Sequence, residues 1–179
     1  MSKYTYTNNY IKEYQNFVPK ELAHRIITQK DLSFNKATTV GGKLSLHRHC
    51  LIKTLDTQFD QEIADVFSNV FRNYIKKFPF FDSIKGDTTG WDHVLYMGDK
   101  GQEYKEHVDL STALEPRILT CSLILNDDYE GGDFTFFEGE YKILKKAYSA
   151  IVFPSNNCFP HAITPVYKGD RHVILTWIR

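Results

Sequence analysis

The sequence predicts a mainly β protein in which short strands form a sandwich, jelly roll or barrel and helices pack on one sheet. The hydrophobic period changes near residue 90, from the three- and four-residue steps of helices to the two-residue alternation of strands. Eight short β-rich runs then follow, separated by turns rich in Gly, Asn, Asp and Pro. The 179 residues suit one domain, with helical support and first strands in 1–90 and a jelly-roll core in 91–179.

Two helices are expected before residue 90. The first begins at Pro19, a residue that suits the first helical position, and Leu22, Ile26 and Ile27 share one of its faces. The second spans about 56–77 and carries apolar residues at three- and four-residue steps. We expect this longer helix to cover the outer face of one sheet.

The β-rich runs give the expected strands. They are 92–97, 104–109, 117–125, 133–137, 141–144, 149–153, 161–166 and 171–178. Between the two helices, Gly41-Gly42 indicates a flexible loop, and the alternation of Leu44 and Leu46 indicates a strand after it.

Composition excludes several classes of protein. Lys plus Arg and Asp plus Glu are 22 each, so the zero net charge argues against binding to nucleic acid or to an anionic membrane through the field of the whole protein. The three cysteines, Cys50, Cys121 and Cys158, form neither a disulfide framework nor a C-x-x-C site. No secretion signal and no apolar run of about 20 residues is present. We therefore expect a soluble cytoplasmic protein with no membrane partner.

Three short segments carry residues suited to chemistry. His107 and Asp109 lie two apart on an expected strand and so project to the same side. His161 opens a later β run, and Arg171 opens the last one. Each alone is more often structural, but an interior Arg171 would need a partner, and its guanidinium suits a carboxylate. Two imidazoles and one carboxylate on one side of a metal leave three positions open, an arrangement typical of non-heme Fe(II) oxygenases.

The stretch from about Val94 to Trp177 resembles the 2-oxoglutarate- and Fe(II)-dependent oxygenases of the prolyl 4-hydroxylase-like superfamily. Five features carry this resemblance, in the family's order. They are Tyr96 and Tyr104 leading to His107-Val108-Asp109; Leu123-Ile124-Leu125-Asn126-Asp127; Gly131-Gly132-Asp133-Phe134-Thr135-Phe136; Ala150-Ile151-Val152-Phe153-Pro154-Ser155; and His161-Ala162-Ile163-Thr164-Pro165-Val166 with Gly169-Asp170-Arg171.

The resemblance implies a double-stranded β-helix fold and a set of site residues. His107, Asp109 and His161 would bind Fe(II), and Arg171 would hold the distal carboxylate of 2-oxoglutarate. Tyr96 and Thr120 are the nearest matches to the hydroxyl that family members place beside that carboxylate. Some members carry a tyrosine in the strand 117–125 where this chain has Leu123 and Ile124, so that hydroxyl is missing here.

The resemblance also implies a reaction. The expected activity is hydroxylation of a C–H bond, with O2 as cosubstrate, ascorbate as a reductant and conversion of 2-oxoglutarate to succinate. The aspartate at 109 disfavours halogenation, because related halogenases carry a small residue there. Family analogy suggests a prolyl residue in a peptide or protein as the substrate. A free amino acid or small metabolite is the alternative, and the sequence leaves the oligomeric state open.

Other interpretations remain open at this stage. His47 and His49 could form a second metal site or a cupin-type pair, and the chain could be a jelly-roll binding protein without activity. Base-repair relatives carry a second arginine soon after the clamp, and Arg179 fits that position poorly. The loops 36–50 and 98–105 are expected to flank the mouth of the pocket.

Overall fold

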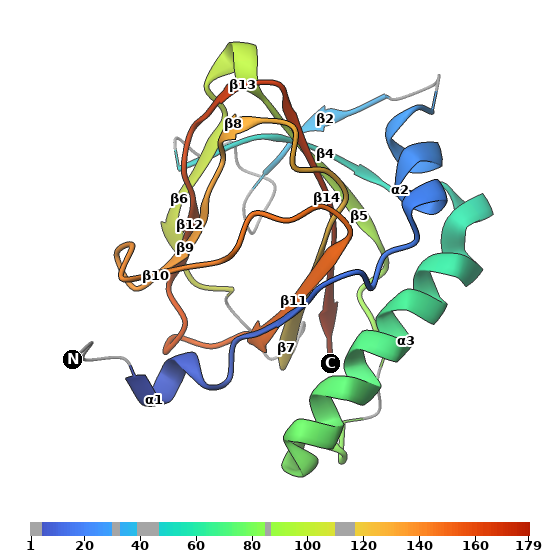
Figure 1. The fold of residues 1–179 in the computed structure, drawn as a ribbon, viewed down its shortest axis with the longest axis vertical. Helices are drawn as coiled ribbons and strands as arrows, with labels where there is room; N and C mark the ends of the chain where they lie inside the picture. The colour runs from blue at the N-terminus through green and yellow to red at the C-terminus, as the bar shows by residue number, and fades with distance from the viewer. Residues whose placement is uncertain (1–4, 30–32, 39–46, 85–86, 110–116) are drawn as a thin grey trace.

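Two β-sheets face each other and enclose the interior, and helices cover the outside of the larger sheet (Figure 1). The computed structural model describes residues 5–29, 33–38, 47–84, 87–109 and 117–179. The expected loop at Gly41-Gly42 and the strand at Leu44 and Leu46 lie outside these residues. The architecture is the expected jelly roll.

Within the described residues the larger sheet has seven strands. In spatial order these are β1 (Lys12–Tyr14), β11 (Ser149–Pro154), β7 (Leu119–Ile124), β14 (Asp170–Ile178), β5 (Asp92–Met97), β4 (Leu51–Thr54) and β2 (Asn35–Lys36). The facing sheet has β10 (Tyr141–Lys142), β9 (Phe134–Phe136), β12 (His161–Ile163), β6 (Glu103–His107) and β3 (Arg48–His49). A third, two-stranded sheet pairs β13 (Val166–Lys168) with β8 (Glu130–Gly131).

The described helices are α1 (Thr5–Asn8), α2 (Lys20–Ile27) and α3 (Asp60–Lys77), with 3-10 turns η1 (Thr57–Phe59), η2 (Pro79–Phe81) and η3 (Gly98–Lys100). Two of the described helices, α2 and α3, occur where the hydrophobic pattern predicts them, and the short α1 was not expected. Asp56 caps η1 by accepting a hydrogen bond from the backbone N–H of Gln58, so the expected helix 56–77 opens with a 3-10 turn. Pro19 precedes α2 with an extended ψ of 130° and is not its first helical residue.

Two hydrophobic layers hold this arrangement together. Outside the larger sheet, Ile63, Phe67 and Val70 of α3 belong to a buried cluster that includes Leu123 and Val152. Burial of each such side chain contributes about 1.5–3 kcal/mol to folding. The long helix therefore covers the sheet as expected, and Figure 1 shows it lying along the sheet's outer face.

The second layer fills the space between the sheets. Ile124, Phe136 and Phe153 are buried in it together with Tyr96. On each strand, every second side chain faces this interior. The polar residues described below share this interior. Among the described helices, none combines the length and the hydrophobicity that crossing a bilayer requires.

Candidate metal and cosubstrate site

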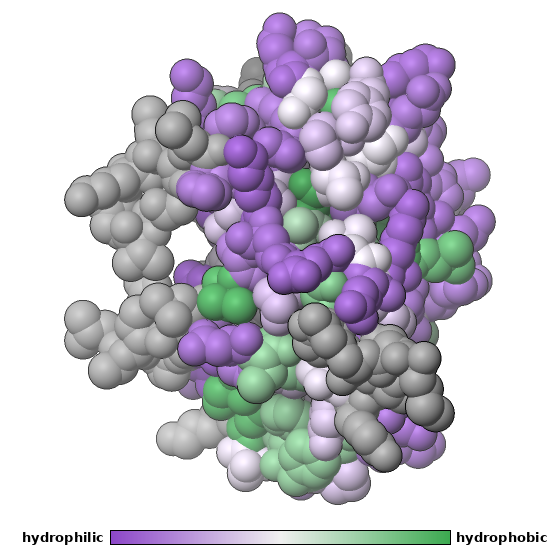
Figure 2. Space-filling view, turned by 90° about the vertical axis from the view of Figure 1, so that its left-hand side faces the viewer, coloured by the Kyte–Doolittle hydropathy of each residue, from purple (hydrophilic) through white to green (hydrophobic). Residues whose placement is uncertain are grey.

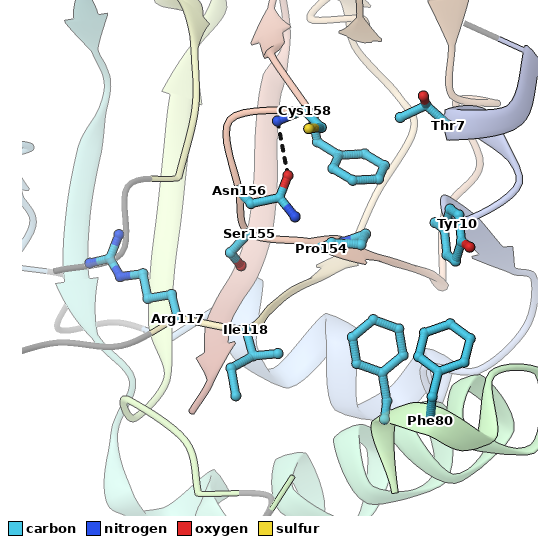
Figure 3. Close-up of a pocket in the computed structure, with 11 residues that line it drawn as sticks. Thr7, Tyr10, Phe80, Arg117, Ile118, Pro154, Ser155, Asn156 and Cys158 are labelled. Atoms are coloured by element: carbon cyan, nitrogen blue, oxygen red, sulfur yellow. Dashed lines mark hydrogen bonds between the residues drawn. The ribbon is translucent and has the colours of Figure 1, made fainter. Parts of the chain in front are cut away.

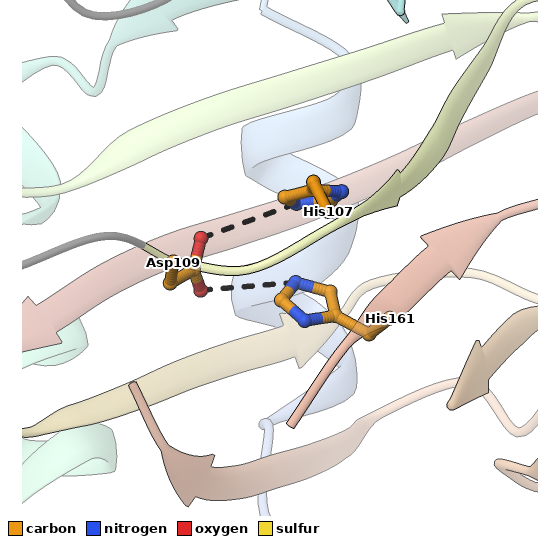
Figure 4. Close-up of side chains that lie close together, drawn as sticks. All are labelled: His107, Asp109 and His161. Atoms are coloured by element: carbon orange, nitrogen blue, oxygen red, sulfur yellow. Dashed lines mark ion pairs between the residues drawn. The ribbon is translucent and has the colours of Figure 1, made fainter. Parts of the chain in front are cut away.

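Two antiparallel neighbours and one loop residue bring three potential metal ligands together (Figure 4). His107 ends β6 and His161 begins β12, and the two residues are register partners. The expected strand 104–109 stops at His107, so Asp109 lies just beyond it. Asp109 Oδ1 is 4.0 Å from His107 Nε2, and Oδ2 is 3.8 Å from His161 Nε2. The ligand atoms all lie within 4.8 Å of one another.

Backbone carbonyls fix both imidazole rings. His107 Nδ1 is 2.8 Å from the carbonyl oxygen of Lys105, and His161 Nδ1 is 3.0 Å from that of Phe159. A carbonyl only accepts, so Nδ1 carries the proton in each ring, and Nε2 keeps its lone pair. Both lone pairs face Asp109, the orientation that metal-binding histidines require.

Asp109 is buried, with 8% of its surface exposed, and is held by the larger sheet. Thr120 Oγ1 donates a 2.6 Å hydrogen bond to Oδ2 of Asp109 and accepts one, at 2.7 Å, from the hydroxyl of Ser155. Burial would raise the pKa of Asp109, but its electrostatic interaction with His161 and the Thr120 hydrogen bond outweigh burial and lower that pKa. The carboxylate is therefore ionised at neutral pH.

The imidazole of His107 is neutral at the same pH. Burial, followed by the neighbouring His161, lowers the pKa of His107 to about 3. Metal ions bind neutral imidazoles and ionised carboxylates, so His107 and Asp109 need not lose a proton when a metal binds at pH 7. Two nitrogens and one oxygen on one side of the site fit Fe(II) with open positions for ligands. The residues present therefore suit the metal that the sequence predicts.

Arg171 occupies the interior deeper along the larger sheet. It is 2% exposed, and its Nε has no hydrogen-bond partner in the described part of the chain. Tyr96 is its register partner on β5, and the guanidinium carbon lies 5.2 Å from the centre of the Tyr96 ring. Among the described residues no acid forms an ion pair with it. A buried cation without a counter-ion is costly, so this site fits a carboxylate supplied by a ligand.

Tyr129, which the sequence analysis did not single out, also contacts Arg171. Burial raises the pKa of Tyr129, and the nearby guanidinium of Arg171 opposes that rise, so the hydroxyl lies close to the cation. A Cβ on Gly132 would lie 2.9 Å from Tyr129 Cε2 and 3.2 Å from Arg171 Cδ, so the glycine allows this close packing. Tyr129 lies outside the strands, and no alternation in the sequence could assign it to the interior.

Thr120 is at the other end of the sheet from Arg171. It pairs with Trp177, six residues along β14 from Arg171, which is about 20 Å of strand. The expectation that Thr120 assists at the distal carboxylate is therefore corrected, because its hydroxyl instead holds Asp109. Tyr96 does lie beside Arg171, as expected, and Tyr129 supplies a hydroxyl that Leu123 and Ile124 lack.

The remaining histidines lie elsewhere. His47 and His49 are exposed, and the only metal-compatible cluster in the described ranges is the one at His107, Asp109 and His161. His93 and His172 are buried and lie 3.0 Å apart through their ring nitrogens. Both alternate with the interior residues of β5 and β14, so they face outward from the larger sheet.

A cavity of about 530 Å³ lies beside residues that support the candidate metal ligands, and Figure 3 shows its lining. Its lining includes Phe80, Ile118, Ser155 and Phe159. Ser155 hydrogen-bonds to Thr120, and the carbonyl of Phe159 hydrogen-bonds to His161. Two residues that line the cavity therefore also help to position the candidate metal ligands. On the face shown in Figure 2, hydrophobic side chains gather in the lower part, and hydrophilic ones dominate above.

Comparison with known proteins agrees with this geometry. Residues 93–179 match the family model of the 2OG-Fe(II) oxygenase superfamily. A PKHD-type hydroxylase of Alteromonas mediterranea is 35% identical over 91 residues, which cover 45% of this chain and 39% of that protein. A PKHD-type hydroxylase of Aliarcobacter butzleri is 25% identical over 177 residues, which cover 90% of this chain and 76% of that protein.

The fold has solved counterparts. One is the prolyl hydroxylase of Trichoplax adhaerens in complex with a peptide fragment of the hypoxia inducible factor oxygen degradation domain. It superimposes with a TM-score of 0.76 at 18% identity and covers 98% of this chain and 85% of that one. The family match, the fold and the His-Asp-His cluster agree, and they identify residues 93–179 as a 2OG-Fe(II) oxygenase domain with the fold of prolyl 4-hydroxylases.

Proposed function

We propose that this chain hydroxylates a C–H bond of its substrate while 2-oxoglutarate is converted to succinate and CO2. The cluster of His107, Asp109 and His161 is the observation that carries the proposal. Hydrogen bonds at Nδ1 orient both rings so that Nε2 can bind Fe(II) beside the Asp109 carboxylate. Bound iron, 2-oxoglutarate and O2 supply the oxidising chemistry.

The chain's own residues bind, orient and exclude water. His107, Asp109 and His161 hold the metal, and Thr120 keeps the Asp109 carboxylate facing it. Arg171, with Tyr96 and Tyr129 against it, takes the distal carboxylate of 2-oxoglutarate at the buried end of the interior. No side chain has to act as a nucleophile or a general base in this reaction.

A prolyl residue in a peptide or protein is the first candidate substrate. The support is a fold shared with a prolyl hydroxylase that binds a peptide, together with similarity to PKHD-type hydroxylases. A free amino acid or small metabolite is the second candidate. The expected partners are therefore a substrate molecule and no nucleic acid, and ascorbate would serve as a reductant.

Succinate formation tests the activity without knowledge of the substrate. Purified protein with Fe(II), 2-oxoglutarate and O2 should form succinate slowly, and a true substrate should accelerate it. Proline-containing peptides and free amino acids are then screened for a mass gain of one oxygen. If no succinate forms under any of these conditions, the chain is a binding protein that shares the fold.

A further inference from the structure

A second arginine lies close to the metal ligands. Arg48 is on β3, at the edge of the smaller sheet, and its register partner is Tyr104 on β6. Its guanidinium carbon is 5.1 Å from the centre of the Tyr104 ring. That ring in turn stacks on His107 with 3.4 Å between ring centres and 13° between planes. A single aromatic ring therefore connects this cation to a metal ligand.

The guanidinium of Arg48 is incompletely satisfied. Nη1 donates a 3.1 Å hydrogen bond to the carbonyl oxygen of Thr38, and the thiol of Cys50 lies close by. Nε is buried and has no partner within the described ranges. These partners are neutral, so they leave the charge of Arg48 uncompensated.

No acid in the described part of the chain forms an ion pair with Arg48. Asp92 is close enough for Arg48 to lower its pKa, but burial acts in the opposite direction and the pKa of Asp92 is raised overall. Asp92 is thus a nearby acid, but it makes no ion pair with Arg48. Arg48 is half-buried, and a guanidinium without an ion pair is best satisfied by a carboxylate held through two parallel hydrogen bonds.

Both carboxylates of the cosubstrate already have partners. The keto-acid end belongs to the metal and the distal end to Arg171, as proposed above. Arg48 and Arg171 both influence Cys50 and Tyr96, so the two cations border the same interior. Arg48 is then a cation beside the candidate metal ligands for which the described residues supply no ion pair.

We propose that Arg48 binds a carboxylate of the substrate. This inference rests on the proposed function and narrows its substrate class to compounds with an acid group near the hydroxylated carbon. Free amino acids, chain-terminal residues and residues beside an acidic side chain belong to that class. An internal residue without a neighbouring acid does not.

Matched acids and amides test this directly. Three matched pairs are compared. The first is L-proline and L-prolinamide, the second is a peptide ending in proline and the same peptide with a C-terminal amide, and the third is a Pro-Asp peptide and its Pro-Asn counterpart. Binding to the protein loaded with Zn(II) and 2-oxoglutarate is measured by calorimetry, and hydroxylation by the Fe(II) protein is measured as a mass gain of one oxygen. We expect at least one acid to bind and react at least tenfold better than its amide.

Two variants assign the effect to Arg48. Arg48→Met keeps the apolar stem and removes the charge, so it should abolish the preference for the acid. Arg25→Met is the matched control, because Arg25 is an exposed partner of Glu62 and should keep the preference. Binding of 2-oxoglutarate to the Zn(II) protein should stay within threefold of wild type in both variants.

The possible outcomes separate the two proposals. If no acid binds better than its amide, or if Arg48→Met keeps the preference, the substrate role of Arg48 is wrong. If Arg48→Met weakens 2-oxoglutarate binding instead, the arginine serves the cosubstrate and the proposal is also overturned. Absence of succinate from the wild-type protein alone contradicts the proposed function, because the binding preference is measured without turnover.

Discussion

The hydroxyl of Thr120 donates a 2.6 Å hydrogen bond to Oδ2 of Asp109 and thereby joins the two sheets across the barrel interior. Thr120 belongs to β7 of the larger sheet, whereas Asp109 follows β6 of the smaller one. Ser155, just after β11, donates to Thr120 and fixes its hydroxyl. The orientation of the candidate metal-binding carboxylate thus depends on a residue of the opposite sheet.

Substitution Thr120→Val should weaken metal binding. Valine keeps the shape of threonine and removes the donor, so Asp109 loses the bond that orients it. Removal of a residue that hydrogen-bonds to a metal ligand typically lowers metal affinity 10–100-fold. The measurement is competition for Zn(II) or Fe(II) with a chelator of known affinity.

Thr176→Val is the matched control. Thr176 is buried in the same sheet and donates to the carbonyl oxygen of Gly90, away from the metal ligands. Both variants should lose about 1 kcal/mol of stability, but only Thr120→Val should lose metal affinity. Equal metal affinities in the two variants would contradict the role given to Thr120.

Substitution His161→Ala should abolish retention of iron. Only His107 and Asp109 would remain, two ligands from one short segment that hold a metal weakly. Iron content after desalting is the measurement. His49→Ala serves as the control because His49 is exposed, and a loss of iron in that variant would revive the cupin-type interpretation.

Substitution Arg171→Ala should leave the metal bound and raise the 2-oxoglutarate requirement by about two to four orders of magnitude. The reason is the loss of a desolvated charge pair, which is worth roughly 3–5 kcal/mol. Calorimetric titration of the Zn(II) protein with 2-oxoglutarate measures the change separately from turnover. An unaltered affinity would show that another cation holds the cosubstrate.

Hydrophobic period predicted most of the fold. The expected strand 92–97 is β5 without change, and 171–178 is β14 to within one residue. The expected run 161–166 instead divides into β12 and β13, because Val166 pairs with Gly131 in another sheet. The edge strand β1 was missed because its three half-buried residues show no apolar alternation. The division into 1–90 and 91–179 stays a prediction.

The site was predicted in part. Spacing placed His107 and Asp109 on one side, and residue type made His161 and Arg171 candidates, but only the resemblance assigned the four residues to one site. The structure brings the three ligand candidates together and corrects Thr120, because a strand pattern cannot tell which end of a sheet a hydroxyl occupies. Tyr129 was missed because it reaches Arg171 from a segment outside the strands.

Substitution Tyr129→Phe should weaken 2-oxoglutarate binding about tenfold. A hydrogen bond to a charged group contributes about 1.5–3 kcal/mol, and part of it is recovered from water. Tyr141→Phe is the control, because that hydroxyl bonds to Glu13 away from Arg171. Calorimetry on the Zn(II) protein compares the two, and the role of Tyr129 is wrong if both bind 2-oxoglutarate equally.

The buried pair of His93 and His172 should make the fold sensitive to acid. His93 is 0% exposed, and burial, followed by the proximity of His172, lowers the pKa of His93 to about 3. In the unfolded chain the pKa of a histidine is about 6.5. The native state therefore excludes a proton that the unfolded state takes up, and stability present above about pH 6.5 is lost as the pH falls towards 3. The loss attributable to His93 is about 2 kcal/mol at pH 5.

Urea unfolding of the metal-free protein at pH 7.5 and 5.0 measures this loss. The variant His93→Leu removes the titrating group, so its free energy of unfolding should fall about 2 kcal/mol less between the two pH values than that of wild type. His107 titrates in both proteins, and its contribution cancels in the difference. His49→Leu, at an exposed position, should keep the wild-type pH dependence. If the free energy of unfolding of His93→Leu depends on pH as it does in wild type, the proton uptake on unfolding belongs to other groups.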